Sequence, residues 1–393
     1  MRRLVTAVTC ALLLVTATGT AAAGTDPRQT ALDNAVRAGN VGIIALASDP
    51  AGHWSGRSGV GDIVTGAKPN PAGRFRIASV SKTFTATLVL KLAAKGRLAL
   101  DDPISKYLPG LLPYPEPITI RQLLQHTSGL PRDLAPQYTW LTLPEIDTER
   151  FEHFGEVEAI NDSTVQPLLF PPGTGWSYSN TGFNVLALLV ERVTGHRFEQ
   201  VLADLITGPL HLTDTFLPRD FPLIPGAAMR GYEQLYPAPH GLTDVTAYNL
   251  SRYFGAGDLI SSANDLNRFF HALLSGQLLP DGLLAQMKTT VPWPGQEDLL
   301  SYGLGLMRLS LTSICGPDAP VVWGHAGDVP GYNTWSMSDE TGTRQITVES
   351  NIDLTAPGTA TSGRILAMVT EFCTPNVAGA AARAAQVQNA VHG

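Results

Sequence analysis

The residues FRIASVSKTFTA, at positions 75–86, decide the fold. A strand-like apolar pattern leads there directly into helical spacing that runs from Ser79 to Lys95 and ends near Gly96. Ser79 and Lys82 are three positions apart, so on a helix their hydroxyl and amine share one face. A serine needs a base at pH 7, and a lysine whose pKa is lowered by burial and nearby positive charge can accept its proton. The stretch therefore predicts a serine nucleophile at the beginning of a helix, where a backbone N–H can point at a developing oxyanion.

The spacing from Ser79 to Lys82 by itself also fits an ordinary exposed pair of side chains about one helical turn apart. The strand that leads into the helix favours the catalytic interpretation, because a nucleophile of this type needs that placement. A Ser-His-Asp hydrolase is a competing architecture, but its GxSxG turn is absent from the whole sequence.

A second candidate element is the turn-rich loop PGTGWSYSN, residues 172–180, which precedes a helix predicted over 181–194. Its Tyr178, beside a cationic lysine, is expected to have a lowered pKa and to pass a proton to a leaving amine. Asn180 is expected to hold a substrate carbonyl through its amide. The alternative is a tyrosine packed between two lobes and an asparagine that caps the helix.

A third candidate element is GHAGD, residues 324–328, on a strand predicted to follow the apolar run VVW at 321–323. Gly327 lets substrate lie against the strand edge, and the backbone N–H of Asp328 is expected to be a second oxyanion donor. His325 is expected to contribute charge or a hydrogen bond to the proton relay. The alternative is a structural histidine whose ring nitrogens are satisfied within the fold.

The remaining pattern predicts a sheet built from both ends of the chain. A helix is expected over 26–39, and strands are expected over 41–48 and 59–64. Short helices dominate the middle of the chain, and strands return after Tyr302. The middle helices are expected at 119–125, 181–194, 198–206 and 264–274, the late strands at 303–311, 321–323, 332–338 and 344–349, and the last helix at 363–372.

With 393 residues, the chain exceeds the size at which one hydrophobic core stops growing, so we expect two packed lobes. The predicted fold class is α/β plus an all-α lobe: an antiparallel sheet flanked by helices, with an inserted helical lobe. The α/β lobe is expected to comprise residues 24–96 and 300–373, and the mainly helical lobe residues 97–299. Residues 374–393 form a tail in which we find no chemistry.

The N-terminus has the features of a secretory signal peptide. Two arginines, an apolar run from Leu4 to about Ala17, and three alanines at 21–23 predict a signal peptide over residues 1–23, cleaved after Ala23. The apolar run is shorter than the roughly 20 residues that a membrane-spanning helix needs. We therefore expect a secreted mature protein without a stable membrane span.

Composition and cysteine usage bound the other classes of function. The net charge of -7 provides no broad cationic field for nucleic acid. No CxxC, HExxH or Cys/His cluster has ligand spacing, so neither a metal nor another cofactor is implied. Once Cys10 leaves with the signal peptide, Cys315 and Cys373 remain, and in an oxidising compartment they either pair or stay as two buried thiols.

In the order SxxK, YxN and HxG, the three motifs resemble the penicillin-recognising serine hydrolases. The likeness is greatest to the actinobacterial D-alanyl-D-alanine carboxypeptidases and to the related class C beta-lactamases and esterases. It runs over most of the mature chain, with further matches in LPGLLP at 108–113, ITIRQLLQHTSGLP at 118–131, residues 182–195 and GAGDLISSAND at 255–265. The resemblance implies the serine beta-lactamase/DD-peptidase fold and a disulfide between Cys315 and Cys373.

The resemblance also implies a role for each candidate residue. Ser79 is then the acylated nucleophile, and Lys82 and Tyr178 share the proton transfer. Asn180 orients the substrate, and His325 occupies a position at which relatives often carry lysine.

Two departures from the family pattern bear on the substrate. Carboxypeptidases of this type commonly carry hydroxyl residues where this chain has Ala326 and Asp328. An acidic side chain in the pocket would repel a terminal carboxylate. A strand arginine helps to bind that carboxylate in relatives, and the candidate here is Arg308, about one residue from the aligned position. An exposed strand arginine is the alternative interpretation of Arg308.

The function implied is that of a serine-type D-Ala-D-Ala carboxypeptidase, which forms an acyl-enzyme on Ser79 and is acylated by beta-lactams. An esterase or a beta-lactamase on the same scaffold is the alternative, because a scaffold does not fix a substrate. A non-catalytic penicillin-binding sensor is a further alternative. The expected partner is a small peptide or beta-lactam, and the expected state is a monomer.

Overall fold

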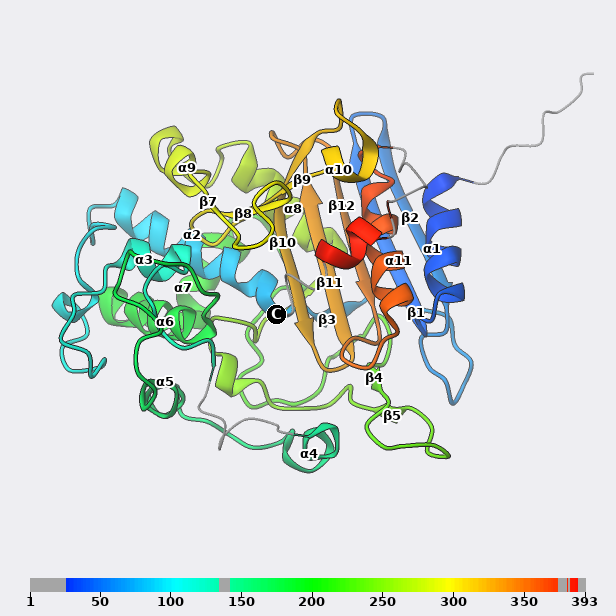
Figure 1. The fold of residues 1–393 in the computed structure, drawn as a ribbon, viewed down its shortest axis with the longest axis horizontal. Coiled ribbons are helices and arrows are strands. Elements are labelled where there is room, and N and C mark those ends of the chain that lie inside the picture. Colours follow the sequence, from blue (N-terminus) through cyan, green and yellow to red (C-terminus); the bar gives the residue numbers. More distant parts are fainter. Residues whose placement is uncertain (1–25, 134–141, 374–379, 381, 388–393) are drawn as a thin grey trace, which may run out of the picture.

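The computed structural model describes residues 26–133, 142–373, 380 and 382–387 (Figure 1). The predicted signal peptide, residues 1–23, lies outside the described residues.

An eight-stranded antiparallel sheet forms the centre of one lobe, in the order β2-β1-β12-β11-β10-β9-β8-β7. Its strands are β1 (Gly42–Asp49), β2 (Gly52–Gly59), β7 (Val291–Pro292), β8 (Leu300–Tyr302), β9 (Met307–Ser310), β10 (Val321–Val329), β11 (Tyr332–Ser338) and β12 (Gln345–Ser350). The first strand of the chain pairs directly with the last, in a register that places Ile43 opposite Ser350. The prediction of an antiparallel sheet built from both chain ends is therefore confirmed.

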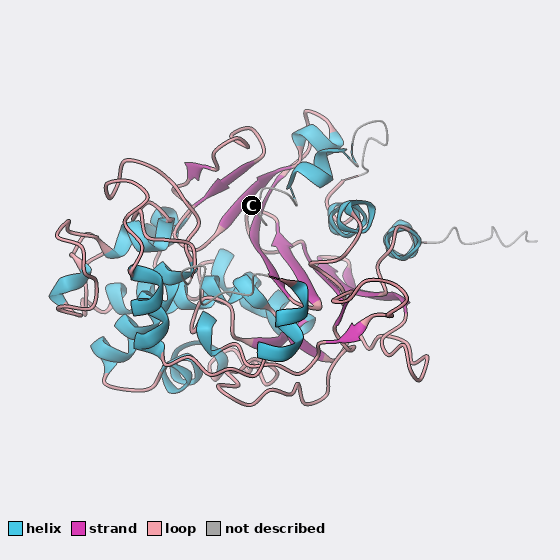
Figure 2. Ribbon diagram, turned by 60° about the horizontal axis from the view of Figure 1, so that its bottom comes forward, coloured by secondary structure: helices cyan, strands magenta, loops and turns pink. Residues whose placement is uncertain are grey.

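Helices cover both faces of this sheet (Figures 1 and 2). On one face, α1 (Pro27–Arg37) packs against α11 (Gly358–Val369), and their apolar side chains meet those of Ile346 and Val348. On the other face, α8 (Ala263–Leu274) packs against β1, β11 and β12. Thus α8, although it comes from the predicted helical lobe, belongs by its contacts to the sheet.

Most of the other helices form the second lobe around α2 (Ser81–Ala94) and α6 (Asn180–Thr194), which pack against each other. The remaining helices outside the sheet are α3 (Ile120–Gln125), α4 (Leu143–Glu149), α5 (Glu156–Thr164), α7 (Phe198–Leu202) and α9 (Asp281–Met287). The short α10 (Thr312–Cys315) lies between β9 and β10 and packs in the core on the sheet side. Two small ladders pair β3 (Arg74–Arg76) with β6 (Ile260–Ser262) and β4 (Tyr232–Glu233) with β5 (Thr243–Asp244). The predicted middle helices lie within one or two residues of α3, α6 and α8. The helix predicted over 198–206 instead becomes α7 and a following π turn over Ala203–Thr207.

One strand prediction was wrong, and another was too long. The strand predicted over 59–64 is a loop, and the strand in this region is β2, which lies at the edge of the sheet. Most β2 side chains are exposed or half-buried, so an edge strand of this kind carries no apolar run that periodicity can detect. The strand predicted over 303–311 is present as the shorter β9, because its first residues form the turn after β8, where Gly305 has a φ of 70°.

None of the helices that the structure describes is both long enough and apolar enough to cross a bilayer.

Candidate active site

Ser79 lies in a single 3-10 turn, Ala78–Val80, that separates β3 from α2. The residue before it, Ala78, has a φ of 47°, a left-handed conformation that is uncommon for a residue with a Cβ. The sequence prediction placed Ser79 as the first helical residue, whereas α2 itself begins at Ser81. The turn joins a short strand to a helix, as expected, and places the hydroxyl at a strained position of the kind that clusters at functional sites.

Lys82 occupies the first turn of α2, with a fully buried side chain. Its Nζ lies 3.0 Å from Ser79 Oγ and donates a second hydrogen bond of 2.7 Å to the carbonyl oxygen of Ala256. Burial lowers the pKa of Lys82 to about 7, and the nearby guanidinium of Arg132 acts in the same direction against the opposing effect of Asp133. A neutral amine is therefore well populated at neutral pH and can accept the proton of Ser79.

Tyr178 reaches the nucleophile from the loop before α6. Its hydroxyl is hydrogen-bonded with Ser79, and Lys82 Nζ lies 4.8 Å from the centre of its ring. The expectation of a lowered phenol pKa was wrong: burial raises the pKa of Tyr178 above its ordinary value and outweighs the hydrogen bond and the charge of Arg132. The phenol therefore keeps its proton at neutral pH and can donate it.

Asn180 is the first residue of α6, and it lines the Ser79 cavity together with Arg132 and Asp133. The helix cap is Ser179, whose hydroxyl accepts the amide of Gly182, so capping does not account for Asn180. Instead, Asn180 Nδ2 donates to Asp133 Oδ1 over 2.8 Å. Arg132 forms a 3.6 Å ion pair with the same carboxylate.

The Ser79 cavity has a volume of about 80 Å³. The residues that line it are Ser79, Arg132, Asp133, Asn180, Tyr253, Ala256, Gly257, Asp328 and Val329. The sequence prediction included Ser79, Asn180 and Asp328 but missed the others. Arg132 and Asp133 directly follow the matching segment at 118–131, and this adjacency was the signal that could have identified them.

The strand β10 passes directly beside the nucleophile at Gly327. A Cβ on this residue would lie 2.3 Å from the carbonyl oxygen of Ile77 and 2.9 Å from the amide nitrogen of Ser79. Only a residue without a side chain permits this approach. The same approach brings the following residue, Asp328, to the wall of the Ser79 cavity.

His325 is buried on β10, with both ring nitrogens engaged away from the nucleophile. Nε2 lies 2.8 Å from the hydroxyl of Tyr302, and Nδ1 is hydrogen-bonded with the carbonyl oxygen of Ala326. Burial lowers the pKa of His325 to about 3, and the charge of Lys82 acts in the same direction. The ring is therefore neutral at neutral pH, and what it can offer the site is a hydrogen bond through Tyr302.

Arg308 lies on β9, where it pairs in register with Trp323 of β10. It is half-buried and is not among the described residues that line the Ser79 cavity. The guanidinium in that cavity belongs to Arg132.

His126 holds the Tyr178 loop and was missed as a candidate. Its carbonyl oxygen accepts the amide of Ser177 over 3.0 Å, and its Nδ1 accepts the amide of Ser179 over 3.1 Å. The imidazole centre lies 4.3 Å from that of the Tyr178 ring. His126 thus bonds both residues that flank the phenol. It also belongs to the matching segment at 118–131, which gave no reason to assign it a role.

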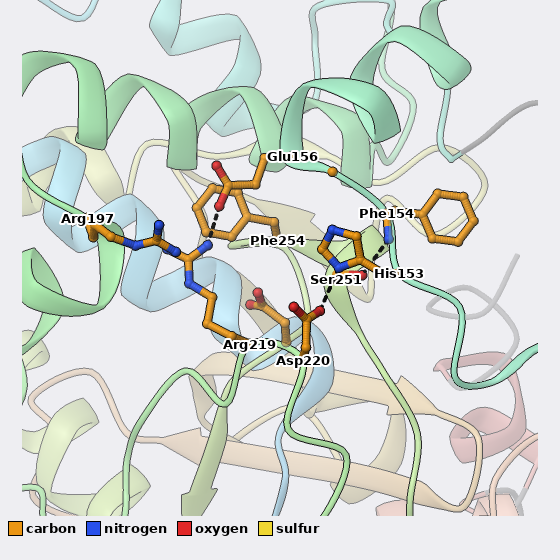
Figure 3. Close-up of a pocket in the computed structure, with 10 residues that line it drawn as sticks. His153, Phe154, Glu156, Arg197, Arg219, Asp220, Ser251 and Phe254 are labelled. Atoms are coloured by element: carbon orange, nitrogen blue, oxygen red, sulfur yellow. Dashed lines mark hydrogen bonds and ion pairs between the residues drawn. The ribbon is translucent and has the colours of Figure 1, made fainter.

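A larger cavity, of about 250 Å³, is lined in part by other residues of the segment 253–258 (Figure 3). Its polar side chains largely satisfy one another: His153 pairs with Asp220, and Arg219 pairs with Glu156. The buried Asp258, whose pKa is raised to about 7 by burial, also lines it. Because Ser79 and Lys82 do not line this cavity, it is separate from the nucleophile.

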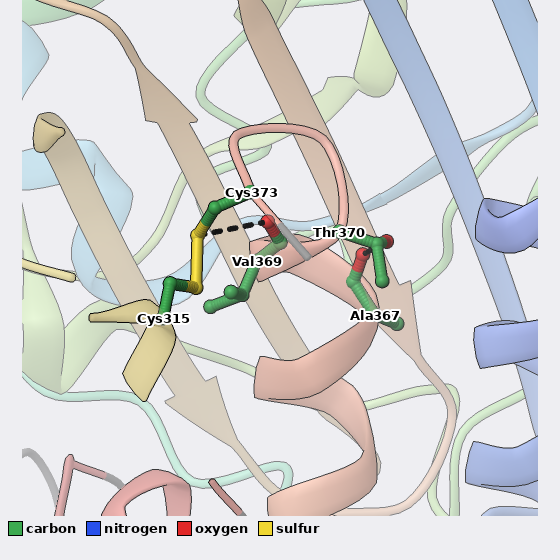
Figure 4. The surroundings of a disulfide bond; sticks show 5 residues. All are labelled: Cys315, Ala367, Val369, Thr370 and Cys373. Atoms are coloured by element: carbon green, nitrogen blue, oxygen red, sulfur yellow. Dashed lines mark hydrogen bonds between the residues drawn. A yellow bond between two sulfur atoms is a disulfide. The ribbon is translucent and has the colours of Figure 1, made fainter. Parts of the chain in front are cut away.

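The Cys315–Cys373 disulfide is present, with Cα atoms 6.2 Å apart (Figure 4). It joins α10, in the connection between β9 and β10, to the end of α11.

The described part of the chain contains no group of three or more His, Cys, Asp or Glu side chains placed to hold a metal ion.

Comparisons with known proteins bear on the family and on the fold. The family model described as Beta-lactamase matches residues 14–371. A Bacillus subtilis protein named as the penicillin-binding protein PbpX is 30% identical over 72% of this chain and 63% of its own. The chain therefore spans less than two thirds of that relative's length.

Two solved structures resemble the fold over nearly their whole length. The D-stereospecific amidohydrolase of a Streptomyces species is 33% identical with a TM-score of 0.78, and the match covers 88% of this chain and 98% of that one. The D-amino acid amidase of Ochrobactrum anthropi SV3, in complex with L-phenylalanine amide, is 26% identical with a TM-score of 0.74, and the match covers 87% and 97%.

The family model covers most of the chain, and the SxxK and YxN motifs supply a serine, a lysine and a tyrosine in mutual contact. This chain belongs to the Beta-lactamase family of penicillin-recognising serine hydrolases.

Proposed function

We propose that this protein hydrolyses an amide bond on the carbonyl side of a D-amino acid residue, through an acyl-enzyme on Ser79. The observation that carries the proposal is the charge of the Ser79 cavity, which is lined by two carboxylates, Asp133 and Asp328, and one guanidinium, Arg132. This balance favours a substrate with an ammonium group near the scissile bond over one with a terminal carboxylate. An unblocked D-aminoacyl amide has that charge.

The preference for a D-residue rests on similarity. The two solved structures described above are a D-stereospecific amidohydrolase and a D-amino acid amidase, and each is covered almost completely by the match. Fold likeness alone would leave the substrate open. The acidic cavity is what makes the amidase chemistry the better supported choice for this chain.

The proposed reaction begins with neutral Lys82, which takes the proton of Ser79 over their 3.0 Å contact. Ser79 Oγ attacks the carbonyl carbon, and the backbone N–H groups of Ser79 and Asp328 stabilise the oxyanion. Tyr178 donates its proton to the leaving nitrogen as the C–N bond breaks and regains one from Lys82. Water then gives a proton to neutral Lys82 and attacks the ester carbonyl, the C–Oγ bond breaks as Lys82 returns that proton to Ser79 Oγ, and the D-amino acid leaves.

The second candidate is the D-Ala-D-Ala carboxypeptidase implied by the motifs. Arg132 favours it, because its guanidinium lines the same cavity and can pair with a terminal carboxylate. Asp328 disfavours it, since a carboxylate occupies a position where carboxypeptidases carry a hydroxyl. An esterase or a beta-lactamase would use the same acyl-enzyme.

Turnover of a matched substrate set tests these proposals. We expect D-alanine amide to be hydrolysed with a kcat/KM at least about tenfold above those of N-acetyl-D-alanine amide and L-alanine amide, because only D-alanine amide has both the ammonium and the D-configuration. A diacylated D-Ala-D-Ala peptide, a chromogenic cephalosporin and a short-chain ester complete the set. Faster turnover of the N-acetylated amide or of the D-Ala-D-Ala peptide would reject the amidase proposal in favour of the carboxypeptidase.

We further propose that the protein is exported with cleavage after Ala23 and acts as a monomer. The N-terminal sequence pattern supports export. N-terminal sequencing of the protein recovered from culture medium, together with its mass in solution by light scattering, tests both statements. An intact N-terminus in the cell pellet, or a multiple of the chain mass, would reject them.

A further inference from the structure

A second hollow adjoins the Ser79 cavity and is not used by the reaction proposed above. It has a volume of about 170 Å³, and its lining consists of Arg132, Trp176, Ser177, Tyr178, Trp293 and Pro294. Arg132 lines both hollows, so the two are neighbours. Tyr178, whose hydroxyl is hydrogen-bonded with Ser79, forms part of its wall.

Aromatic side chains from two separate elements form the walls of this hollow. Trp176 lies on the Tyr178 loop, and Trp293 lies in the turn between β7 and β8. Their rings are 4.5 Å apart between centres, and the Trp293 ring is nearly parallel to that of Tyr178 at 5.9 Å. Among the described residues, the buried indole Nε1 of Trp176 has no hydrogen-bond partner.

Backbone hydrogen bonds hold both walls in place. The amide of Trp293 donates to the carbonyl oxygen of Leu300 over 3.0 Å, and the amide of Ser177 donates to His126 over 3.0 Å. Trp293 and Tyr178 are each less than a tenth exposed. The hollow is therefore a formed part of the fold and is not a gap between loose surface side chains.

We propose that this hollow is the subsite for the leaving group, and that it selects a leaving group with an aromatic ring. The inference rests on the proposed function. Tyr178 hands its proton to the leaving nitrogen, so the cavity that Tyr178 lines holds whatever that nitrogen carries. Offset and edge-to-face contacts with Trp176 and Trp293 then favour an aromatic group over an aliphatic one of similar size.

Size and charge agree with this assignment. An apolar cavity of about 150 Å³ in another protein accepts benzene, so 170 Å³ is enough for one six-membered ring. The only charged side chain among the lining residues is the guanidinium of Arg132, which lies 5.1 Å from the centre of the Tyr178 ring. No carboxylate among them would repel the electron-rich face of a bound ring.

The test uses three substrates that share the D-alanyl group and differ only in the leaving amine: D-alanine methylamide, cyclohexylmethylamide and benzylamide. We expect the benzylamide to have a kcat/KM about tenfold above that of the cyclohexylmethylamide. Trp293→Ala should bring the ratio of kcat/KM for the benzylamide to that for the cyclohexylmethylamide close to 1, with both rates measured on the same variant. Trp176→Ala provides a second variant on a more exposed residue, and Trp54→Ala removes an indole outside the hollow as the matched control.

An equal loss on all three substrates, or a benzyl preference retained in both cavity variants, would overturn the subsite. Saturation-transfer NMR can measure binding of the product benzylamine to the Ser79→Ala protein. This readout needs no turnover. We expect binding that Trp293→Ala abolishes and Trp54→Ala preserves. If no D-alanine amide is hydrolysed but this binding pattern is seen, the proposed function is rejected and the hollow is still supported as a binding site for an aromatic ring. If the amides are hydrolysed but benzylamine does not bind, only the subsite fails.

Discussion

Lys82 is held between charges of opposite sign, and their balance sets the pH at which it can act. Burial lowers its pKa to about 7, Asp133, Asp328 and Asp258 raise it, and Arg132 lowers it. A lysine acts as a base only after it has lost its proton. The ordinary lysine pKa, near 10.5, would leave almost none of it neutral at pH 7.

We therefore predict that kcat/KM for acylation increases with pH through an apparent pKa near 7. Below that pH, Lys82 carries a proton and cannot accept the one from Ser79. The measurement is a pH profile of kcat/KM between pH 5 and 9 with D-alanine amide, and the profile should fall again above pH ~8, where the ammonium of the substrate loses its proton. A flat profile would contradict the assignment of Lys82 as the base.

Replacing the two neighbouring charges should move this midpoint in opposite directions. Asp133→Asn removes an effect that raises the Lys82 pKa, so its midpoint should shift to lower pH. Arg132→Gln removes an effect that lowers it, so its midpoint should shift to higher pH. Each variant is the control for the other. Both disturb the cavity wall, but one removes a negative charge and the other removes a positive charge. Midpoints that shift together would show that Lys82 is not the group that titrates.

Gly327 fixes the gap between β10 and the nucleophile. We predict that Gly327→Ala lowers kcat/KM on the order of 10²-fold, because its Cβ would press on the backbone of Ile77 and Ser79 and displace them. Gly282→Ala is the control, since nothing lies within 4 Å of the added Cβ there. Steady-state kinetics with a thermal melt separates this effect from unfolding. Full activity in Gly327→Ala would show that the strand does not need to approach Ser79 so closely.

Among the elements, the Tyr178 loop depends on the end of α3. His126 ends that helix at φ 61° and bonds the amides on either side of the phenol. Asparagine tolerates this left-handed conformation and offers a side-chain acceptor, whereas alanine offers none. A buried amide without a partner costs about 1–3 kcal/mol.

We predict that His126→Ala lowers kcat about 10-fold or more with a smaller change in KM, and that His126→Asn recovers part of the loss. The expected cause is a misplaced phenol, so the loss should be larger for an amide than for an ester with a good leaving group, which needs less protonation. Paired kinetics on the two substrates measures this. An identical loss on both would indicate general destabilisation instead.

The disulfide ties α11 to the connection between β9 and β10. Its two cysteines are 58 residues apart, and closing a loop of that length stabilises a fold by about 4 kcal/mol in the chain-entropy model. We predict that Cys315→Ser/Cys373→Ser lowers the free energy of unfolding by about 2–4 kcal/mol while the Lys82 midpoint stays unchanged, because the bridge lies away from the Ser79 cavity. Urea titration measures the first effect. No loss of stability would show that reduced cysteines pack equally well.

At the scale of the whole molecule, the predictable parts were those that repeat a local pattern. Helices α3, α6 and α8 have clear apolar periodicity, and β10 begins with the apolar run at 321–323. The strand β2 was missed because an exposed edge needs no such run. Nothing local to α8 indicates that it packs against the sheet, because that depends on residues far away in the chain.

The candidate site likewise contains residues that the sequence could identify and features that only the folded structure shows. Ser79, Lys82, Tyr178 and Asn180 could be proposed from motifs whose spacing carries the chemistry. The raised pKa of Tyr178 could not, because burial is a property of the assembled fold. Trp293 could not be proposed either, since it meets Tyr178 only when the turn between β7 and β8 folds over the loop.

Because β1 pairs with β12 on one side and with β2 on the other, the sheet that supports the site is closed only by the last strand of the chain. The hairpin of β1 and β2 is local in sequence, whereas the pairing of β1 with β12 joins residues about 300 positions apart. A chain that ends before residue 321 lacks β10, and Ser79 then has neither Gly327 nor Asp328 beside it. The nucleophile therefore depends for its surroundings on residues about 250 positions further along the chain.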